Sequence, residues 1–189
     1  MIALRPALAS DGAAIGAVTT RAFGDDGDQV AALVGALAAG PARISLVAAD
    51  DETIVGHTML SRGWIDAERD LVEALVLSPL SVEPSRQRQG IGGSLVRAAL
   101  GEAADRGMPA VFLEGDPRYY ERFGFVGGSS RGFVRPSPRI PQPAFQVVVL
   151  PAWKPWMTGA LVYPDVFWAC DMVGLRGDRL ATVRAQVGE

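Results

Sequence analysis

The sequence predicts an α/β protein in which helices cover both faces of a sheet. Apolar extended segments alternate along the chain with segments whose apolar residues recur at helical spacing. Glycine- and proline-rich breaks separate them. The length of 189 residues and the hydrophobic fraction of 49% suit one domain, or one domain with an extension. The predicted strands are 2–4, a hairpin of 44–49 with 53–60, 71–82, 110–113, and a last hairpin of 133–134 with 145–150.

Two helices are predicted near the N-terminus. The first runs from 11 to about 23, with Ser10 as a candidate N-cap. A polar, glycine-containing break follows it. Asp28 is a candidate cap for the second helix, which ends before Gly40-Pro41. Further helices are predicted at 94–106 and 117–122.

Composition excludes several classes of function. The net charge is −3 and Lys154 is the only lysine, so we expect no broad surface for nucleic acid or acidic membrane. Cys170 is the only cysteine, which rules out an intramolecular disulfide and a Cys/His zinc cluster, and we expect no metal site. Arg5 and Asp11 interrupt any apolar leader. The apolar runs are too short to span a bilayer. We expect a cytoplasmic protein.

The most informative segment is the loop at 82–94, between the strand at 71–82 and the predicted helix at 94–106. A helix start leaves backbone N–H groups unpaired, and the helix dipole favours negative charge there. Gly90, Gly92 and Gly93 permit close approach to the backbone, and arginines lie beside them. This order of elements predicts a site for an anionic phosphate ligand.

Three kinds of phosphate site compete. A P-loop requires a Lys-Ser or Lys-Thr pair after its second glycine, and no lysine is near. A dinucleotide fingerprint, which would indicate a nucleotide-dependent oxidoreductase, places Leu95 where its third glycine should stand. The third pattern fits best: Gln87-Arg88-Gln89-Gly90-Ile91-Gly92 resembles motif A of the GNAT N-acetyltransferase superfamily, Arg/Gln-x-x-Gly-x-Gly/Ala.

This resemblance implies that the loop amides bind the pyrophosphate of acetyl-CoA. It also implies a GNAT-like fold, which is a mixed, mostly antiparallel twisted sheet with a splayed central strand pair. Pro79 cannot donate to a strand ladder, which agrees with a bulge there. In the superfamily the pantetheine arm lies in the wedge that this bulge opens, and a nearby amide faces the thioester oxygen. The implied cofactor-binding residues are Leu80, Ser81, Val82, Gln87, Arg88, Gln89, Gly90, Ile91, Gly92, Gly93, Ser94, Tyr119 and Phe123.

A second segment is similar to motif B of the same superfamily. Residues 119–125, Tyr-Tyr-Glu-Arg-Phe-Gly-Phe, match Phe-Tyr-x-x-hydrophobic-Gly-Phe. Together with 77–82 and 115–117, this segment resembles a bacterial subgroup, the YhbS-like acetyltransferases. The resemblance covers roughly residues 2 to 150. We therefore expect an acetyltransferase domain at 1–150 and an aromatic-rich extension at 151–189, which packs on the domain or forms a dimer contact.

The resemblance also assigns catalytic roles. Tyr120 lies where the superfamily's general-acid tyrosine lies and would protonate the leaving thiolate, with Tyr119 as the alternative, since consecutive helical residues point in different directions. The base is open. Glu73 is a candidate acting through water, and ordered water alone is another possibility. His57 is attractive because of its pKa, but a structural role in its apolar strand is favoured.

The implied activity is transfer of an acetyl group from acetyl-CoA to a primary amine of a small molecule, a peptide or a protein. The alternative is a non-catalytic acyl-CoA-binding sensor or assembly module. The sequence names neither the acceptor nor the preferred acyl group, and a homodimer is one possible assembly.

Overall fold

The computed structural model describes residues 2–188, which form two compact units. Unit 1 comprises the residues up to Ser61 together with Leu77–Arg106, and unit 2 comprises Arg62–Val76 and the residues from Gly107 onward. The strand order is β1-β2-β3-β4-β5-β7-β6, with β8 paired to β3. The strands are β1 (Ile2–Pro6), β2 (Ala42–Asp50), β3 (Thr53–Ala67), β4 (Leu71–Val82), β5 (Ala110–Glu114), β6 (Val126–Gly127), β7 (Phe145–Val149) and β8 (Gly159–Val162).

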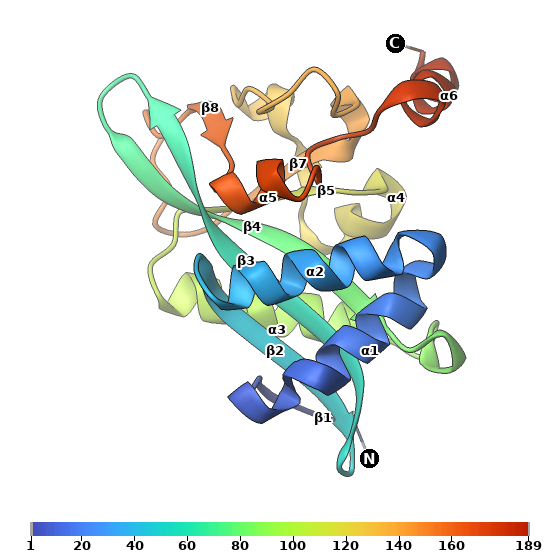
Figure 1. Cartoon of the computed structure of the whole chain (residues 1–189). Coiled ribbons are helices and arrows are strands. Elements are labelled where there is room, and N and C mark those ends of the chain that lie inside the picture. Colours follow the sequence, from blue (N-terminus) through green and yellow to red (C-terminus); the bar gives the residue numbers. More distant parts are fainter. Residues whose placement is uncertain (1, 189) are drawn as a thin grey trace. The chain divides into compact units, whose positions relative to one another are not determined.

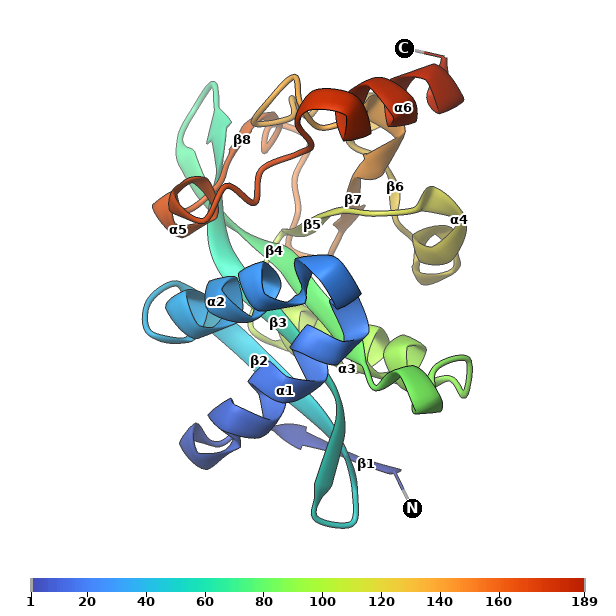
Figure 2. The same cartoon turned by 45° about the vertical axis from the view of Figure 1, so that its right-hand side comes forward.

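In unit 1, helices lie on both faces of the strands. Helices α1 (Gly12–Phe23) and α2 (Gly27–Ala38) pack on each other over one face. Helix α3 (Ile91–Asp105) packs against β2 on the opposite face (Figures 1 and 2). Each helix contributes fully buried side chains, which explains the helical spacing of the apolar residues. The buried residues of these helices include Leu33, Leu37, Leu95 and Val96.

In unit 2, β5 is the central strand. It pairs antiparallel with β7 along its whole length, and three fully buried rings, those of Phe112, Phe133 and Phe145, pack together at this point. The chain beyond residue 150 belongs to the same unit. Its strand β8 pairs with the end of β3. The remaining helices are α4 (Pro117–Tyr120), α5 (Asp165–Ala169) and α6 (Gly177–Val187).

Strand β4 also pairs within unit 2. It runs parallel to β5 there, and Leu75 pairs with Val111 and Val76 with Phe112. The pairs β1–β2, β2–β3, β3–β8, β5–β7 and β6–β7 are antiparallel, in agreement with the fold class.

Several local predictions were wrong. The last hairpin does not form: β7 pairs with β5 and β6, whereas Val134 makes only an isolated bridge to Ala160. Ser10 does not cap α1, since it lies inside a short 3-10 turn. Asp28 lies within α2 instead of capping it. Helix α3 begins three residues before the predicted start at Ser94.

Candidate active site

The glycine loop has the geometry of an open helix start. Gly90 is the N-cap of α3 in a left-handed conformation, with φ of 85°. The first helical hydrogen bond runs from the Ser94 N–H to the Gly90 carbonyl at 3.0 Å. The N–H groups of Ile91, Gly92 and Gly93 precede that bond, so they have no acceptor within the helix. The early helix start therefore places two glycines in the turn that presents these groups.

Side chains of the loop brace it internally. Gln87 donates from Nε2 to the Val82 carbonyl at 3.1 Å. Arg86 donates to Gln89 at 3.2 Å and pairs with Asp50 at 2.8 Å. Arg88 is exposed and has a left-handed backbone, with φ of 59°. Arg86 is therefore engaged in holding the loop, and Arg88 is the loop arginine that faces solvent.

The predicted residues of β4 come directly before this loop. Leu80 and Val82 are partly exposed, and Ser81 is fully buried. The Ser81 hydroxyl lies 3.2 Å from the Thr19 hydroxyl on α1. The Ser81 side chain is thus committed to packing inside unit 1.

Sequence reasoning missed how α1 is attached to the end of β4. The Arg21 guanidinium forms hydrogen bonds of 2.8 to 3.1 Å with both carboxylate oxygens of Glu83. Together with the buried contact between Thr19 and Ser81, this pairing fixes α1 beside the strand that leads into the loop. Both pairs are separated by 62 residues in sequence, so no local pattern could reveal them.

In unit 2, the predicted aromatic residues form one cluster. The ring centroids of Tyr119 and Tyr120 are 4.9 Å apart, and those of Tyr119 and Phe123 are 5.7 Å apart. Phe125 packs against Tyr120 with an edge-to-face separation of 5.7 Å. Edge-to-face pairs of this kind stabilise the orientation of the rings. Helix α4, which carries the two tyrosines, is capped by Asp116, whose carboxylate accepts the Arg118 N–H.

The two tyrosines occupy different environments. The Arg122 guanidinium carbon lies 4.1 Å from the centroid of the Tyr119 ring. The Tyr120 ring lies against the backbone of Gly115. Burial, and secondarily Tyr119, raise the pKa of the Tyr120 phenol above its ordinary value of 10. The Tyr120 phenol is therefore protonated at neutral pH.

Two carboxylates of unit 2 differ in their surroundings. Glu73, the predicted base, is partly buried near the start of β4 and is not part of the aromatic cluster. Glu114, which sequence reasoning did not single out, ends β5 and accepts hydrogen bonds from Tyr163 and Gly174. Burial raises the pKa of the Glu114 carboxyl to about 7, against the opposing effect of these donors and of Arg139. Glu114 directly follows the apolar residues 110–113 of β5. A charged residue at that place is the sequence feature that could have identified it.

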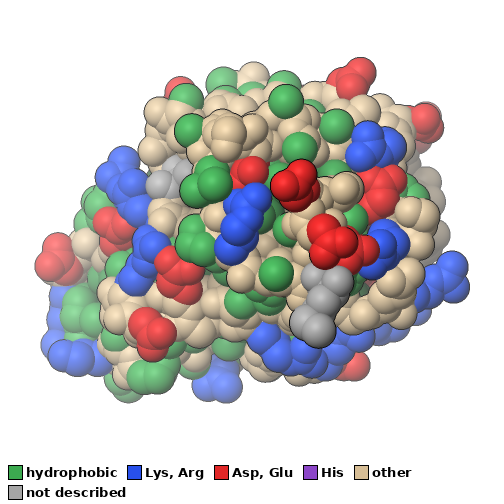
Figure 3. All heavy atoms as spheres, turned by 90° about the horizontal axis from the view of Figure 1, so that it is seen from below, with side chains coloured by type: hydrophobic (Ala, Val, Ile, Leu, Met, Phe, Trp, Pro, Cys, Tyr) green, Lys and Arg blue, Asp and Glu red, His purple; other side chains and the backbone are tan. Residues whose placement is uncertain are grey.

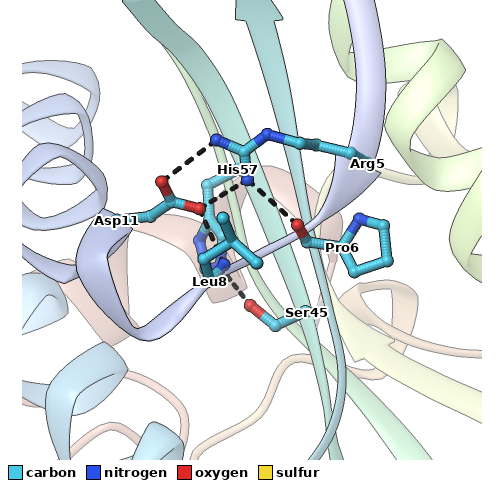
Figure 4. Close-up of polar contacts among 6 residues, drawn as sticks. All are labelled: Arg5, Pro6, Leu8, Asp11, Ser45 and His57. Atoms are coloured by element: carbon cyan, nitrogen blue, oxygen red, sulfur yellow. Dashed lines mark hydrogen bonds and ion pairs between the residues drawn. The ribbon is translucent and has the colours of Figure 1, made fainter. Parts of the chain in front are cut away.

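His57 has a structural setting in unit 1 (Figure 4). Its Nε2 lies 3.0 Å from the Ser45 hydroxyl, its side chain is fully buried, and burial lowers its pKa to about 4. Figure 4 also shows the Asp11 carboxylate, which pairs with Arg5 at 2.6 Å and accepts the Leu8 N–H. A histidine that is neutral and enclosed in this way agrees with the structural role favoured above.

Other binding features are limited in the described part of the chain. Positive and negative side chains are interspersed on the face that Figure 3 shows, so neither sign forms a continuous patch there. Within residues 2–188, no cluster of three or more His, Cys, Asp or Glu residues is placed to hold a metal ion. No helix among these residues is both long and apolar enough to cross a membrane.

Comparison with known families and sequences agrees with these features. The family model described as an acetyltransferase (GNAT) domain matches residues 41–127. A protein of Escherichia coli K12, described as uncharacterized N-acetyltransferase YjhQ, is 37% identical over 136 residues, which is 70% of this chain and 74% of the relative. The uncharacterized N-acetyltransferase YhbS of the same strain is 34% identical over 83 residues, or 43% of this chain and 48% of the relative.

Solved structures show the same fold. The crystal structure of Escherichia coli YhbS in complex with CoA has a TM-score of 0.78 and 29% identity, and the match covers 88% of this chain and 91% of that chain. A GNAT family acetyltransferase from Brucella melitensis, in complex with acetyl-CoA, has a TM-score of 0.71 and 31% identity. That match covers 88% of this chain and 98% of the other.

Proposed function

This chain belongs to the GNAT family of N-acetyltransferases, and on that premise we propose that it transfers an acetyl group from acetyl-CoA to a primary amine of a small molecule, a peptide or a protein. The observation that carries the proposal is the start of α3. There a left-handed Gly90 and the glycines after it present unpaired N–H groups beside an exposed arginine. This is the arrangement that proteins use to bind phosphate groups.

Cofactor binding would be centred on this loop. The N–H groups of Ile91, Gly92 and Gly93 would donate to the pyrophosphate oxygens, with the helix dipole adding to the attraction. Arg88 would add a positive charge, because it is the loop arginine that faces solvent. Two structural relatives were solved with CoA and with acetyl-CoA, which supports this choice of ligand.

The reaction is a direct acyl transfer. The neutral amine nitrogen attacks the thioester carbon, the carbon–sulfur bond breaks, and the thiolate takes up a proton, giving an amide and free CoA. A backbone amide near Leu80 would donate to the thioester oxygen as negative charge develops there. Tyr120 would supply the proton to the thiolate, a role proposed from its place in motif B.

The amine must first lose a proton, since a free alkylammonium group has a pKa of about 10. Glu73 acting through water remains the proposed acceptor of this proton, with ordered water alone as the alternative. Replacing Glu73 by Gln separates the two: a base acting through Glu73 would be lost, and kcat would fall at every pH below the pKa of the amine. Unchanged kcat would favour water.

Calorimetry with acetyl-CoA tests the cofactor site. We expect micromolar binding by the wild type and none by Gly92→Glu, because the new side chain brings negative charge to the anion path. Gly101→Glu is the matched control: it places the same side chain on the same helix, where a Cβ meets no atom within 4 Å. Equal binding by both variants would refute the proposed phosphate site.

Turnover tests catalysis. We expect release of the CoA thiol when acetyl-CoA is mixed with a panel of amines, including polyamines, amino acids and peptides. Tyr120→Phe should lower kcat without weakening acetyl-CoA binding, and Tyr119→Phe should have the smaller effect. Tight acetyl-CoA binding with no thiol release for any amine would instead support a non-catalytic acyl-CoA-binding module.

A further inference from the structure

One carboxylate of unit 2 joins the C-terminal segment to the strand that leads into motif B. The Tyr163 hydroxyl donates to Oε1 of Glu114 at 2.9 Å, and the Gly174 N–H donates to Oε2 at 3.1 Å. Tyr163 is only 4% exposed. Arg139 acts on the same carboxylate and pairs at 3.6 Å with Asp171. Both donors therefore come from a short stretch far along the chain, and they meet at one buried acceptor.

Both backbone polar groups of Gly115, the residue after Glu114, form hydrogen bonds. The Gly115 N–H donates to the Ala144 carbonyl at 3.0 Å. The Gly115 carbonyl accepts from the side chain of Gln146 at 2.9 Å, and Gln146 is only 1% exposed. The end of β5 and the turn that follows it are thus held by contacts from Ala144, from Gln146 in β7 and from the C-terminal segment.

Tyr120 rests directly on this turn. A Cβ added to Gly115 would lie 2.6 Å from Cε2 of the Tyr120 ring. A Cβ at this close approach would force the ring or the backbone to shift, so the contact depends on glycine at position 115. The position of the Tyr120 ring therefore depends on where the backbone at Glu114 and Gly115 is held.

We propose that Glu114 is a positioning residue: by binding Tyr163 and Gly174, it fixes the Gly115 backbone on which the Tyr120 ring lies, and so sets the direction of the Tyr120 phenol. The catalytic meaning of this arrangement rests on the proposed function. A proton donor must be within hydrogen-bond reach of its acceptor. Misplacement by about 1 Å can cost about 100-fold in rate.

The first test follows Tyr120 directly and needs no acceptor. The chain has three tyrosines, at 119, 120 and 163, so carbon-13 tyrosine NMR signals can be assigned with three Tyr→Phe variants. In Glu114→Ala we expect the Tyr120 signal to shift or broaden along with that of Tyr163. Trp168→Ala is the matched control, since Trp168 lies in the same C-terminal segment but is 43% exposed. A folded Glu114→Ala protein with an unchanged Tyr120 signal would overturn the proposal.

The second test is a kinetic double-mutant cycle. We expect Glu114→Ala to lower kcat by about 10- to 100-fold while the Kd for acetyl-CoA changes less than about twofold. In the Tyr120→Phe background the same substitution should have little further effect, because residues that act through one group are not additive. Equal losses in both backgrounds would show that Glu114 does not act through Tyr120. If Glu114→Ala fails to fold, Tyr163→Phe removes one of the two donors and is expected to give the same pattern with a smaller loss.

The outcomes separate this proposal from the proposed function. Wild-type kcat in Tyr120→Phe would remove the catalytic role of the phenol, and the NMR arm would still decide whether Glu114 positions the ring. A slow Tyr120→Phe enzyme beside a fully active Glu114→Ala enzyme would keep the proposed function and reject the positioning role.

Discussion

The buried Glu114 carboxyl makes the stability of the protein depend on pH in a defined direction. The pKa of this group is about 7 in the folded protein, against an ordinary value of 4.5. Between these two values the folded state holds a proton that the unfolded chain has released. The free energy of unfolding therefore falls as pH rises. The difference of about 2.5 corresponds to about 3 kcal/mol, because one pKa unit is equivalent to about 1.4 kcal/mol.

Glu114→Gln removes this titration and isolates its effect. Urea unfolding of wild type and variant across pH 4.5 to 8 gives the difference between their free energies of unfolding. We expect the wild type to lose about 3 kcal/mol relative to the variant as pH rises from 4.5 through 7, with no further change above that. Tyr163→Phe should move the change to higher pH, because the Tyr163 hydrogen bond lowers the Glu114 pKa. A difference independent of pH would refute the reasoning.

Two further predictions concern buried groups. The pKa of His57 is about 4 in the folded state, against an ordinary value of 6.5. As pH falls from 6.5 to 4, the free energy of unfolding of the wild type, measured with urea, should therefore decrease by up to about 3 kcal/mol relative to that of His57→Gln. A difference that does not depend on pH would count against an enclosed, neutral histidine. Gly115→Ala should lower the free energy of unfolding by about 1 to 3 kcal/mol and reduce kcat, because its Cβ meets the Tyr120 ring. In thermal denaturation, Gly101→Ala should instead be neutral or stabilising, and equal effects of the two substitutions would contradict the packing argument.

Local features of this chain could be predicted from its sequence. The start of α3 depends on a glycine that adopts the left-handed conformation and on neighbours a few residues away, so the phosphate loop is visible as a pattern. Strand β4 matches the predicted range 71–82 at both ends.

Features that depend on distant residues could not be predicted. Ser10 and Asp28 are good capping residues by type, but short 3-10 turns precede both helices and move the caps elsewhere. The predicted hairpin of 133–134 with 145–150 fails for a similar reason. Strand β7 pairs with β5 and β6 and not with residues 133–134. The roles of Glu114 and Tyr163 arise from residues 49 positions apart. No spacing rule connects them.

The position of the C-terminal segment could not be predicted for the same reason. Its aromatic residues predict burial but not its location, and two of them, Tyr163 and Phe167, are buried in unit 2. Strand β8 extends the sheet beside β3, and Tyr163 and Gly174 supply both hydrogen bonds to the Glu114 carboxylate. Without these donors, a carboxylate would remain buried with its acceptors unsatisfied, which is costly. The segment after residue 150 is therefore bound to the strand end on which the Tyr120 ring depends, although it lies outside both sequence motifs.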